Sequence, residues 1–190
     1  RFLKKALMIA CPVALQGMLN TIVNMVDTLM IGGLGSTAIA AVGLANKVFF
    51  VFSLLVFGIV SGGGILAAQF WGSGDVKNIR KVLGLCVMLA MVGAMFFVVP
   101  ALTAPRMVMR IFTTSEGSIE LGAKYLRIAA LSYPFIALTN VYVAMLRATN
   151  KVVFPVICSC IAIVVNICLN YVLIFGKFGA PTMGVAGAAC

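Results

Sequence analysis

The sequence predicts an all-α membrane protein with several helices that cross the bilayer. Three observations predict this class: 63% of the 190 residues are hydrophobic, only 9% are charged, and the mean hydropathy is +1.18. A soluble domain carries about 25% charged residues. A surface that faces lipid explains the shortage of polar side chains, because acyl chains offer them no hydrogen-bond partner.

The predicted spans follow from the length of the apolar segments, since a helix needs about 20 mainly apolar residues to cross a bilayer. Gly32-Gly33 ends the first segment and Pro100 ends the third, whereas Pro155 lies in the first turn of the fifth, where its missing N–H is harmless. The predicted spans are residues 6–31, 46–71, 82–99, 119–146 and 153–175, with a sixth that starts near residue 183 and is cut off at residue 190.

The positions of the charges predict the orientation. If the loops alternate between two sides, eight cations lie on the side of the N-terminus and six on the other side, three of them in the long predicted loop 101–124. Because cytoplasmic loops carry the excess of Lys and Arg, we expect a cytoplasmic N-terminus in the plasma (inner) membrane. A nucleic-acid partner is not expected, since the cations do not follow one face with interleaved aromatic residues.

The sequence offers no arrangement that supports catalysis or a cofactor. It has no His, no Ser-x-x-Lys motif, and no Cys-x-x-Cys pair among its six cysteines. These absences exclude a zinc site of mixed ligands and predict buried free thiols. We therefore expect a protein that is not an enzyme.

Polar residues of the first span form one stripe. Asp27 is an acid within a span, and a charge at the membrane centre costs about 2.5–3.5 kcal/mol. Gln16, Asn20 and Asn24 fall with Asp27 within about 80° on a helical wheel. The stripe predicts a face turned toward the bundle interior. Two alternatives stay open: Asp27 can lie near the interface, or the amides can simply join helices by hydrogen bonds.

The fifth span repeats this pattern. Ser159, Asn166 and Asn170 lie within about 40° of one face. The first and fifth spans run in the same direction, so Asp27, Asn166 and Asn170 are expected to share a cavity in the outer half of the membrane. A carboxylate with amide oxygens nearby can hold H⁺ or Na⁺.

Other residues of the spans carry weaker predictions. Pro12 and Pro134 predict bends that are either static kinks or hinges. The series Gly58, Gly62, Gly63 and Gly64 predicts close helix packing, since Gly58 and Gly62 are four residues apart. In the fourth span Thr139 and Asn140 fall toward the inner end, so we do not place these two residues with Asp27.

Several stretches together resemble the multidrug and toxic compound extrusion (MATE) transporters. Pro12 lies fifteen residues before Asp27. The similar stretches are, in order, NMVDTLMIGGLG, AIAAVGLAN, AAQFWGSGD, YLRIAALSYPF and NICLNYVLIFGKFGAPTMGVAGAA. The resemblance implies a twelve-span transporter of two six-helix lobes, of which this chain is the N-terminal lobe, without most of span six and without the C-terminal lobe.

The resemblance also implies roles for single residues. Asp27 matches the first-span acid that takes part in cation coupling, and Asn166 matches an Asn of the same site, so Asp27 and Asn166 could hold Na⁺. Asn170 falls where some members carry Asp, and Pro12 matches a Pro near the bend of the first span. Gln16, Asn20 and Asn24 are then candidates for the substrate cavity.

The function predicted from these features is secondary active export by alternating access, coupled to H⁺ or Na⁺. The expected substrates are small cationic or amphipathic drugs and toxic compounds. One alternative is a flippase of lipid-linked precursors, which would need more cationic residues in its cavity. The other is a non-transporting scaffold subunit of a membrane complex, in which Asp27 and the amides could be replaced without loss of function.

Overall fold

The computed structural model describes residues 36–175 and, in the first predicted span, residues 14, 17, 18, 21, 22 and 25. Its described part is entirely helical between residues 36 and 175 apart from short turns, which confirms the predicted all-α class. The helices are α2 (Ser36–Gly72), α3 (Val76–Thr103), α4 (Pro105–Arg110), α5 (Glu116–Ala148) and α6 (Val153–Phe175).

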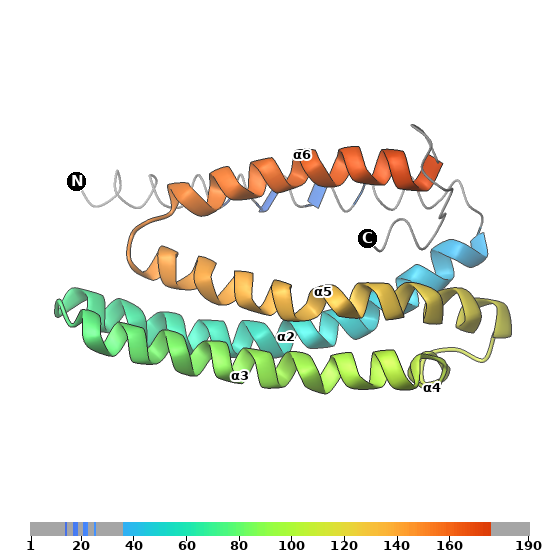
Figure 1. Cartoon of the computed structure of the whole chain (residues 1–190), viewed down its shortest axis with the longest axis horizontal. Coiled ribbons are helices and arrows are strands. Elements are labelled where there is room, and N and C mark those ends of the chain that lie inside the picture. The colour runs from blue at the N-terminus through green and yellow to red at the C-terminus, as the bar shows by residue number, and fades with distance from the viewer. Residues whose placement is uncertain (1–13, 15–16, 19–20, 23–24, 26–35, 176–190) are drawn as a thin grey trace.

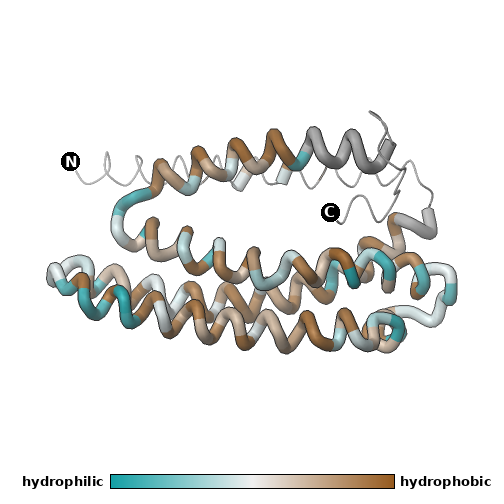
Figure 2. Tube along the Cα trace, viewed as in Figure 1, coloured by the Kyte–Doolittle hydropathy of each residue, from teal (hydrophilic) through white to brown (hydrophobic). Residues whose placement is uncertain are grey.

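Three of the described helices have the length and composition of membrane spans. These are Ile39–Gly72 in α2, the whole of α3, and the whole of α5, while α6 adds the apolar stretch Val153–Asn166. Figure 2 shows hydrophobic residues along the middle of the helices and hydrophilic residues gathered at their ends. This distribution is that of a multi-pass membrane protein, because the middle of each helix lies among acyl chains.

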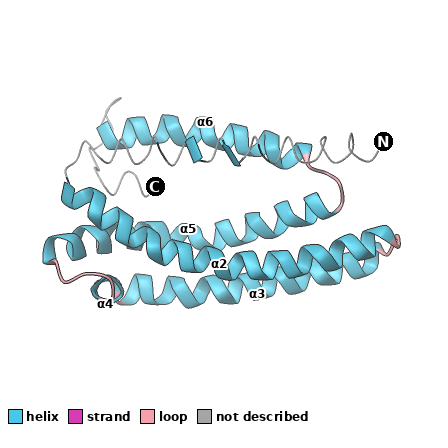
Figure 3. Ribbon diagram, turned by 180° about the vertical axis from the view of Figure 1, so that it is seen from behind, coloured by secondary structure: helices cyan, strands magenta, loops and turns pink. Residues whose placement is uncertain are grey.

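Helices α2, α3 and α5 pack against one another as a three-helix bundle, and α6 lies beside α5 with few contacts to the bundle (Figure 1). The short α2–α3 and α5–α6 turns lie at one end of the molecule, which we call the turn end, and α4 lies at the other, which we call the α4 end (Figure 3). Gly74 has φ 74° in the first turn and Asn150 has φ 61° in the second, so both turns use the left-handed region.

Each helix of the bundle buries one narrow stripe, because its buried residues recur every three or four positions. Many of the buried residues are small, which lets the backbones approach closely as in other membrane bundles. The stripe of α5 is Ile119, Ala123, Leu126, Ala130, Tyr133, Ala137, Val141 and Met145, and that of α3 is Val82, Cys86, Ala90, Ala94, Val98 and Ala101.

Aromatic rings join the three stripes at the middle of the bundle. Tyr133 of α5 stacks on Phe52 of α2, with ring centroids 4.7 Å apart and planes 9° from parallel. Phe97 of α3 meets the edge of Phe52 at 5.8 Å, and Phe49 meets Tyr133 at 5.7 Å. Aromatic pairs of this kind contribute about 0.5–1.5 kcal/mol beyond the area they bury.

The structure differs from the sequence prediction at the α4 end. Helix α3 continues through Pro100 to Thr103, where the sequence predicted a stop. The N–H of Ala104 donates to the Pro100 carbonyl at 2.9 Å, and the Thr103 hydroxyl donates to the Val99 carbonyl at 2.7 Å. These bonds hold the last turn beyond the proline.

The predicted loop 101–124 is therefore mostly helical. It contains α4 and the start of α5, so Lys124 lies on a helix. Pro105 starts α4, where its missing N–H costs nothing. Helix α2 likewise begins at Ser36, ten residues before the predicted span, and carries Lys47.

Close helix packing occurs at Gly63, which belongs to the predicted glycine series of α2. Among the described residues, no neighbouring helix comes within 4 Å of the place where a Cβ would stand at Gly58 or Gly62. A Cβ at Gly63 would collide with Sγ of Cys86 and lie 3.3 Å from the Met145 methyl. The glycine series thus marked the right segment of α2, and the structure adds that Gly63 is the member of the series that meets α3.

We expect Gly63→Ala to lower the free energy of unfolding by about 1–3 kcal/mol, the usual cost of overpacking. Cys86→Ala in the same chain should restore most of this loss, because it removes the sulfur that the new methyl meets. Thermal unfolding in detergent measures both effects. Gly62→Ala is the matched control and should leave the stability equal or slightly higher; a Gly63→Ala protein as stable as this control would contradict the packing.

Candidate functional site

A cavity of about 1210 Å³ lies between α2, α5 and α6. It exists because the α5–α6 turn sets α6 apart from the tightly packed bundle, so the faces of α2 and α5 toward α6 are not filled by side chains of α6. Gly17 of the first predicted span also lines the cavity. Pockets for drug-sized ligands occupy about 300–1000 Å³, so this space admits a ligand of that size.

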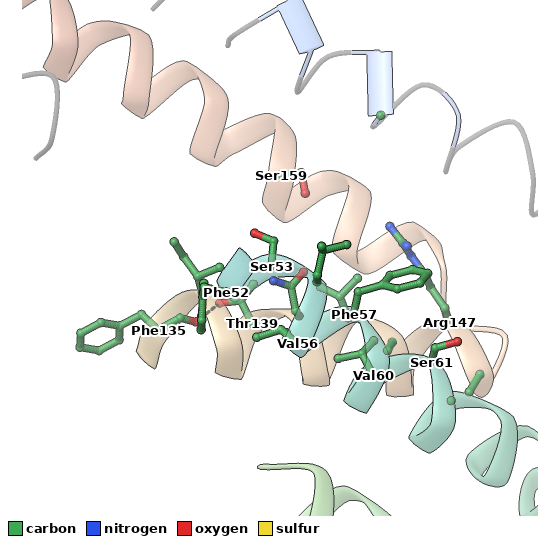
Figure 4. A pocket seen from close by; sticks show the side chains of 18 of the residues that line it. Phe52, Ser53, Val56, Phe57, Val60, Ser61, Phe135, Thr139, Arg147 and Ser159 are labelled. Carbon is green, nitrogen blue, oxygen red and sulfur yellow. Dashed lines mark hydrogen bonds between the residues drawn. The ribbon is translucent and has the colours of Figure 1, made fainter. Parts of the chain in front are cut away.

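The cavity combines aromatic walls with hydroxyl and amide groups. Figure 4 shows Ser159 of α6 pointing toward α2 and α5, with Ser53 and Thr139 on these facing helices. The aromatic part comes from the two bundle helices, α2 and α5. Its polar residues are Ser53, Ser61, Ser132, Thr139, Asn140, Arg147 and Ser159, and its aromatic residues are Phe50, Phe52, Phe57 and Phe135.

The hydrogen bonds of these residues leave binding capacity in the cavity. The Thr139 hydroxyl donates to the Phe135 carbonyl at 2.8 Å, and the Ser132 hydroxyl donates to the Ala129 carbonyl at 2.7 Å. Each hydroxyl oxygen can still accept a hydrogen bond from a ligand. The Asn140 amide has no hydrogen-bond partner within the described residues, so it can both donate and accept.

The charge of the described lining is positive and sits at one end. Arg147, in the last turn of α5, is the only charged residue among the described residues that line the cavity. Figure 4 shows its side chain at the turn end of the cavity. A negative charge for a cationic ligand must therefore come from outside this part of the lining.

The predicted coupling and cavity residues of the first span, together with Pro12, lie outside the described residues. Those residues are Pro12, Gln16, Asn20, Asn24 and Asp27. Asn166 lies on α6 with an exposed side chain, seven residues after Ser159. Seven residues are about two helical turns, so both residues belong to the same face of α6, about 10 Å apart along its axis. Asn170 also belongs to α6, but its side chain lies outside the description.

Pro134 lies within α5, which runs through it without a break. A proline removes the donor for the carbonyl four residues earlier, which is that of Ala130. The carbonyl of neighbouring Ala129 accepts a hydrogen bond from the Ser132 hydroxyl. The role of Pro134 as a hinge stays a prediction.

Sequence reasoning missed part of this cavity. It kept Thr139 and Asn140 apart from Asp27 and assigned them to no cavity, whereas the structure places both in the same cavity as Ser159. A signal was present in the fourth span: Ser132 and Thr139 are seven residues apart, and so are Asn140 and Arg147. Such a repeat places polar residues along one face of a helix.

Comparisons with known proteins decide the family. The family model described as MatE matches residues 12–172 of the chain. The chain belongs to the MatE family. The resemblance seen in the sequence is therefore confirmed, and the fold is that of a MatE transporter lobe.

Relatives of this MatE chain include proteins from distant bacteria. The chain is 33% identical over 188 residues to the probable multidrug resistance protein NorM of Thermotoga maritima, a match that covers 98% of this chain and 40% of that protein. It is 32% identical to the probable multidrug resistance protein YoeA of Bacillus subtilis, with 94% and 39% covered. The chain thus spans about 40% of the length of these relatives.

Solved structures show the same fold. A transporter of the MOP superfamily from Pyrococcus furiosus superposes with a TM-score of 0.87 at 24% identity, covering 98% of this chain and 40% of that one. An outward-facing multidrug resistance MATE family transporter gives the same TM-score, identity and coverage.

We expect the cavity to contain water in the full-length protein. Maleimide labelling tests this, because thiols react with maleimide only where water supports the thiolate. In a variant whose own cysteines are replaced by alanine, Ser53→Cys and Thr139→Cys should react about tenfold faster than Phe96→Cys with a water-soluble maleimide. The Phe96 side chain is 74% exposed on the outer face of α3, where lipid covers it. Labelling is measured in vesicles of both orientations; equal rates at all three positions would contradict a wet cavity.

Proposed function

We propose that this chain forms one lobe of a secondary active exporter that expels cationic or amphipathic compounds in exchange for H⁺ or Na⁺. The observation that carries the proposal is the large cavity between α2, α5 and α6 in a lobe of the MatE family. Aromatic walls suit the apolar body of such a compound, and the hydroxyl and amide groups suit its polar part. The names of the two relatives, both probable multidrug resistance proteins, support the same class of substrate.

The exporter needs more protein than this chain, which spans about 40% of its relatives. In the proposal, a C-terminal lobe completes the substrate pathway, and the whole protein lies in the plasma membrane with a cytoplasmic N-terminus. Among its described lining residues, the cavity has a single cation, Arg147 at its end. A flippase of anionic lipid-linked precursors would need more cations than this, so the lining fits an exporter of cations better.

The coupling site is proposed to lie farther along the same cavity faces. Gly17 and Ser159 both line the cavity. Asn24 follows Gly17 by seven residues, and Asn166 follows Ser159 by seven, so each falls two helical turns farther on the same face by sequence spacing. Asp27 is one further turn along the first span. A carboxylate sheltered from lipid beside Asn166 and Asn170 is typical of proton and cation sites in transporters.

We expect Asp27→Asn to abolish ion-coupled drug efflux, because the amide cannot exchange a proton and has no charge to attract a cation. Efflux of a fluorescent cation from cells and from proteoliposomes with an H⁺ or Na⁺ gradient measures the effect. Asp75→Asn is the matched control.

The Asp75 side chain caps α3 by accepting from the N–H of Asn78 at 3.1 Å, and Asn at position 75 can cap in the same way. The control should therefore transport normally. Undiminished coupled export by an Asp27→Asn protein that inserts normally would reject the role of Asp27.

We also expect Asn140→Ala to weaken substrate binding about tenfold, since a lost hydrogen bond in a sheltered site costs about 1–2 kcal/mol. Binding of a fluorescent amphipathic cation to the purified full-length protein measures this change. Asn46→Ala removes the same side chain from an exposed position of α2 outside the cavity and should leave the affinity unchanged. Equal affinities of the two variants would exclude Asn140 from the substrate site.

A further inference from the structure

A second cavity, of about 350 Å³, lies at the α4 end, where α3 passes into α4. It is far smaller than the first cavity and is lined by different residues. Three cations line it: Arg106 from α4, and Lys124 and Arg127 from the third and fourth turns of α5. Glu120 is the only acid among its described lining residues. Three positive charges against one negative charge leave this cavity with an excess of two positive charges.

The ion pairs of the described residues do not include the guanidinium groups of Arg106 and Arg127. Nζ of Lys124 lies 3.5 Å from Oε1 of Glu120, and Nη2 of Arg110 lies 3.2 Å from Oε1 of Glu116. Within the described part of the chain, neither Arg106 nor Arg127 pairs with a carboxylate. Guanidinium groups bind phosphate oxygens through two parallel hydrogen bonds, so these two side chains form a suitable pair for a phosphate group.

The charges of α3, α4 and α5 place this cavity at the membrane boundary. Residues 82–105 and residues 128–146 contain no charged side chain. Each run is about as long as the 20 residues that cross the hydrocarbon core. Arg106 follows the first run and Arg127 precedes the second, so both cations lie where the acyl region gives way to the lipid headgroups.

Apolar side chains next to the cations point to lipid as the source of the phosphate. Met107 of α4 is 72% exposed and Ile111 is 78% exposed, while Pro105 and Met109 are buried and hold α4 against the bundle. Exposed apolar residues beside cations at this depth are typical of helices that lie in the membrane interface. A free phosphate would gain nothing from Met107 and Ile111, whereas acyl chains would contact them.

We propose that the cavity formed by Arg106, Lys124 and Arg127 binds the phosphate headgroup of an anionic phospholipid. The headgroup fills the cavity and its acyl chains run along the apolar surface beside Met107. With the predicted orientation, the lipid belongs to the outer leaflet. The proposal is independent of the exported substrate, since this cavity lies at the end of the bundle opposite Arg147.

Lipid binding to the full-length protein in detergent tests the proposal, with native mass spectrometry as the readout. Phosphatidylglycerol should bind in preference to phosphatidylcholine, because the choline cation is repelled by the cavity. Arg106→Gln together with Arg127→Gln should weaken phosphatidylglycerol binding about 25-fold, roughly fivefold for each cation removed. Lys77→Gln with Arg80→Gln, which removes two exposed cations at the turn end, is the matched control and should change little.

Two further variants keep the test decisive if the glutamine pair folds poorly. Arg106→Lys with Arg127→Lys keeps both charges and should retain most of the binding. Glu120→Gln removes the repelling carboxylate and should strengthen binding a few-fold, the opposite sign from the loss of a cation. Melting temperatures in lipid-free detergent show whether each variant folds.

Several results would overturn the proposal. Wild-type affinity in the Arg106→Gln and Arg127→Gln protein would exclude the cavity as the site, as would an equal loss in the turn-end control or weaker binding in Glu120→Gln. Equal binding of phosphatidylcholine would exclude recognition of net charge. Glycerol phosphate, which has no acyl chains, should bind far more weakly than the lipid; equal binding would assign the site to a free phosphate and overturn the lipid.

Discussion

The architecture depends on the close approach of α2, α3 and α5 along narrow stripes of small residues. In a bilayer, apolar side chains gain no free energy from leaving lipid for other apolar side chains, so packing contacts must hold the helices together. Alanine recurs along the stripes of α3 and α5, in α5 at every seventh residue, and allows this approach. The ring of Tyr133 then reaches Phe52. Where the stripes meet, Gly63 leaves room for the sulfur of Cys86.

The same constraint explains why a cavity forms on the other side of α5. Helix α5 has one stripe of small residues, and that stripe is used by α2 and α3. Its face toward α6 carries Phe135, Thr139 and Asn140, which line the cavity. Helix α6 lies apart from the bundle, and the space between them is open to ligands. A lobe built in this way has a rigid side and an open side.

The sequence predicted the helices of this fold because the thickness of the bilayer sets the length of each apolar segment, and segments of that length are recognised from composition alone. It did not predict how each helix is rotated about its axis. It marked the glycine series of α2, for example, but did not show that Gly63 is the member that faces α3. Thr139 and Asn140 were not assigned to a cavity with Ser159 because only their depth was considered, although the seven-residue repeat of α5 contained their direction. The sequence predicted a stop at Pro100 because a local pattern does not show the hydrogen bonds from Thr103 and Ala104 that extend α3 beyond this proline. The helix α4 that follows was missed with it.

The distribution of charge around the two cavities constrains how an exporter of this kind can work. The described walls of the large cavity carry Arg147 and no acid, so they supply aromatic and hydrogen-bonding contacts but no counter-charge for a cation. In the proposed mechanism, a cationic compound and the coupling ion then depend on one carboxylate, that of Asp27. In this proposal, a proton neutralises the carboxylate and a bound Na⁺ compensates its charge. Either ion thus removes the attraction that holds a cationic substrate there, an attraction that is strong where the local dielectric is low. Substrate and ion then compete for one site, and exchange also requires that they reach the cavity from opposite sides of the membrane.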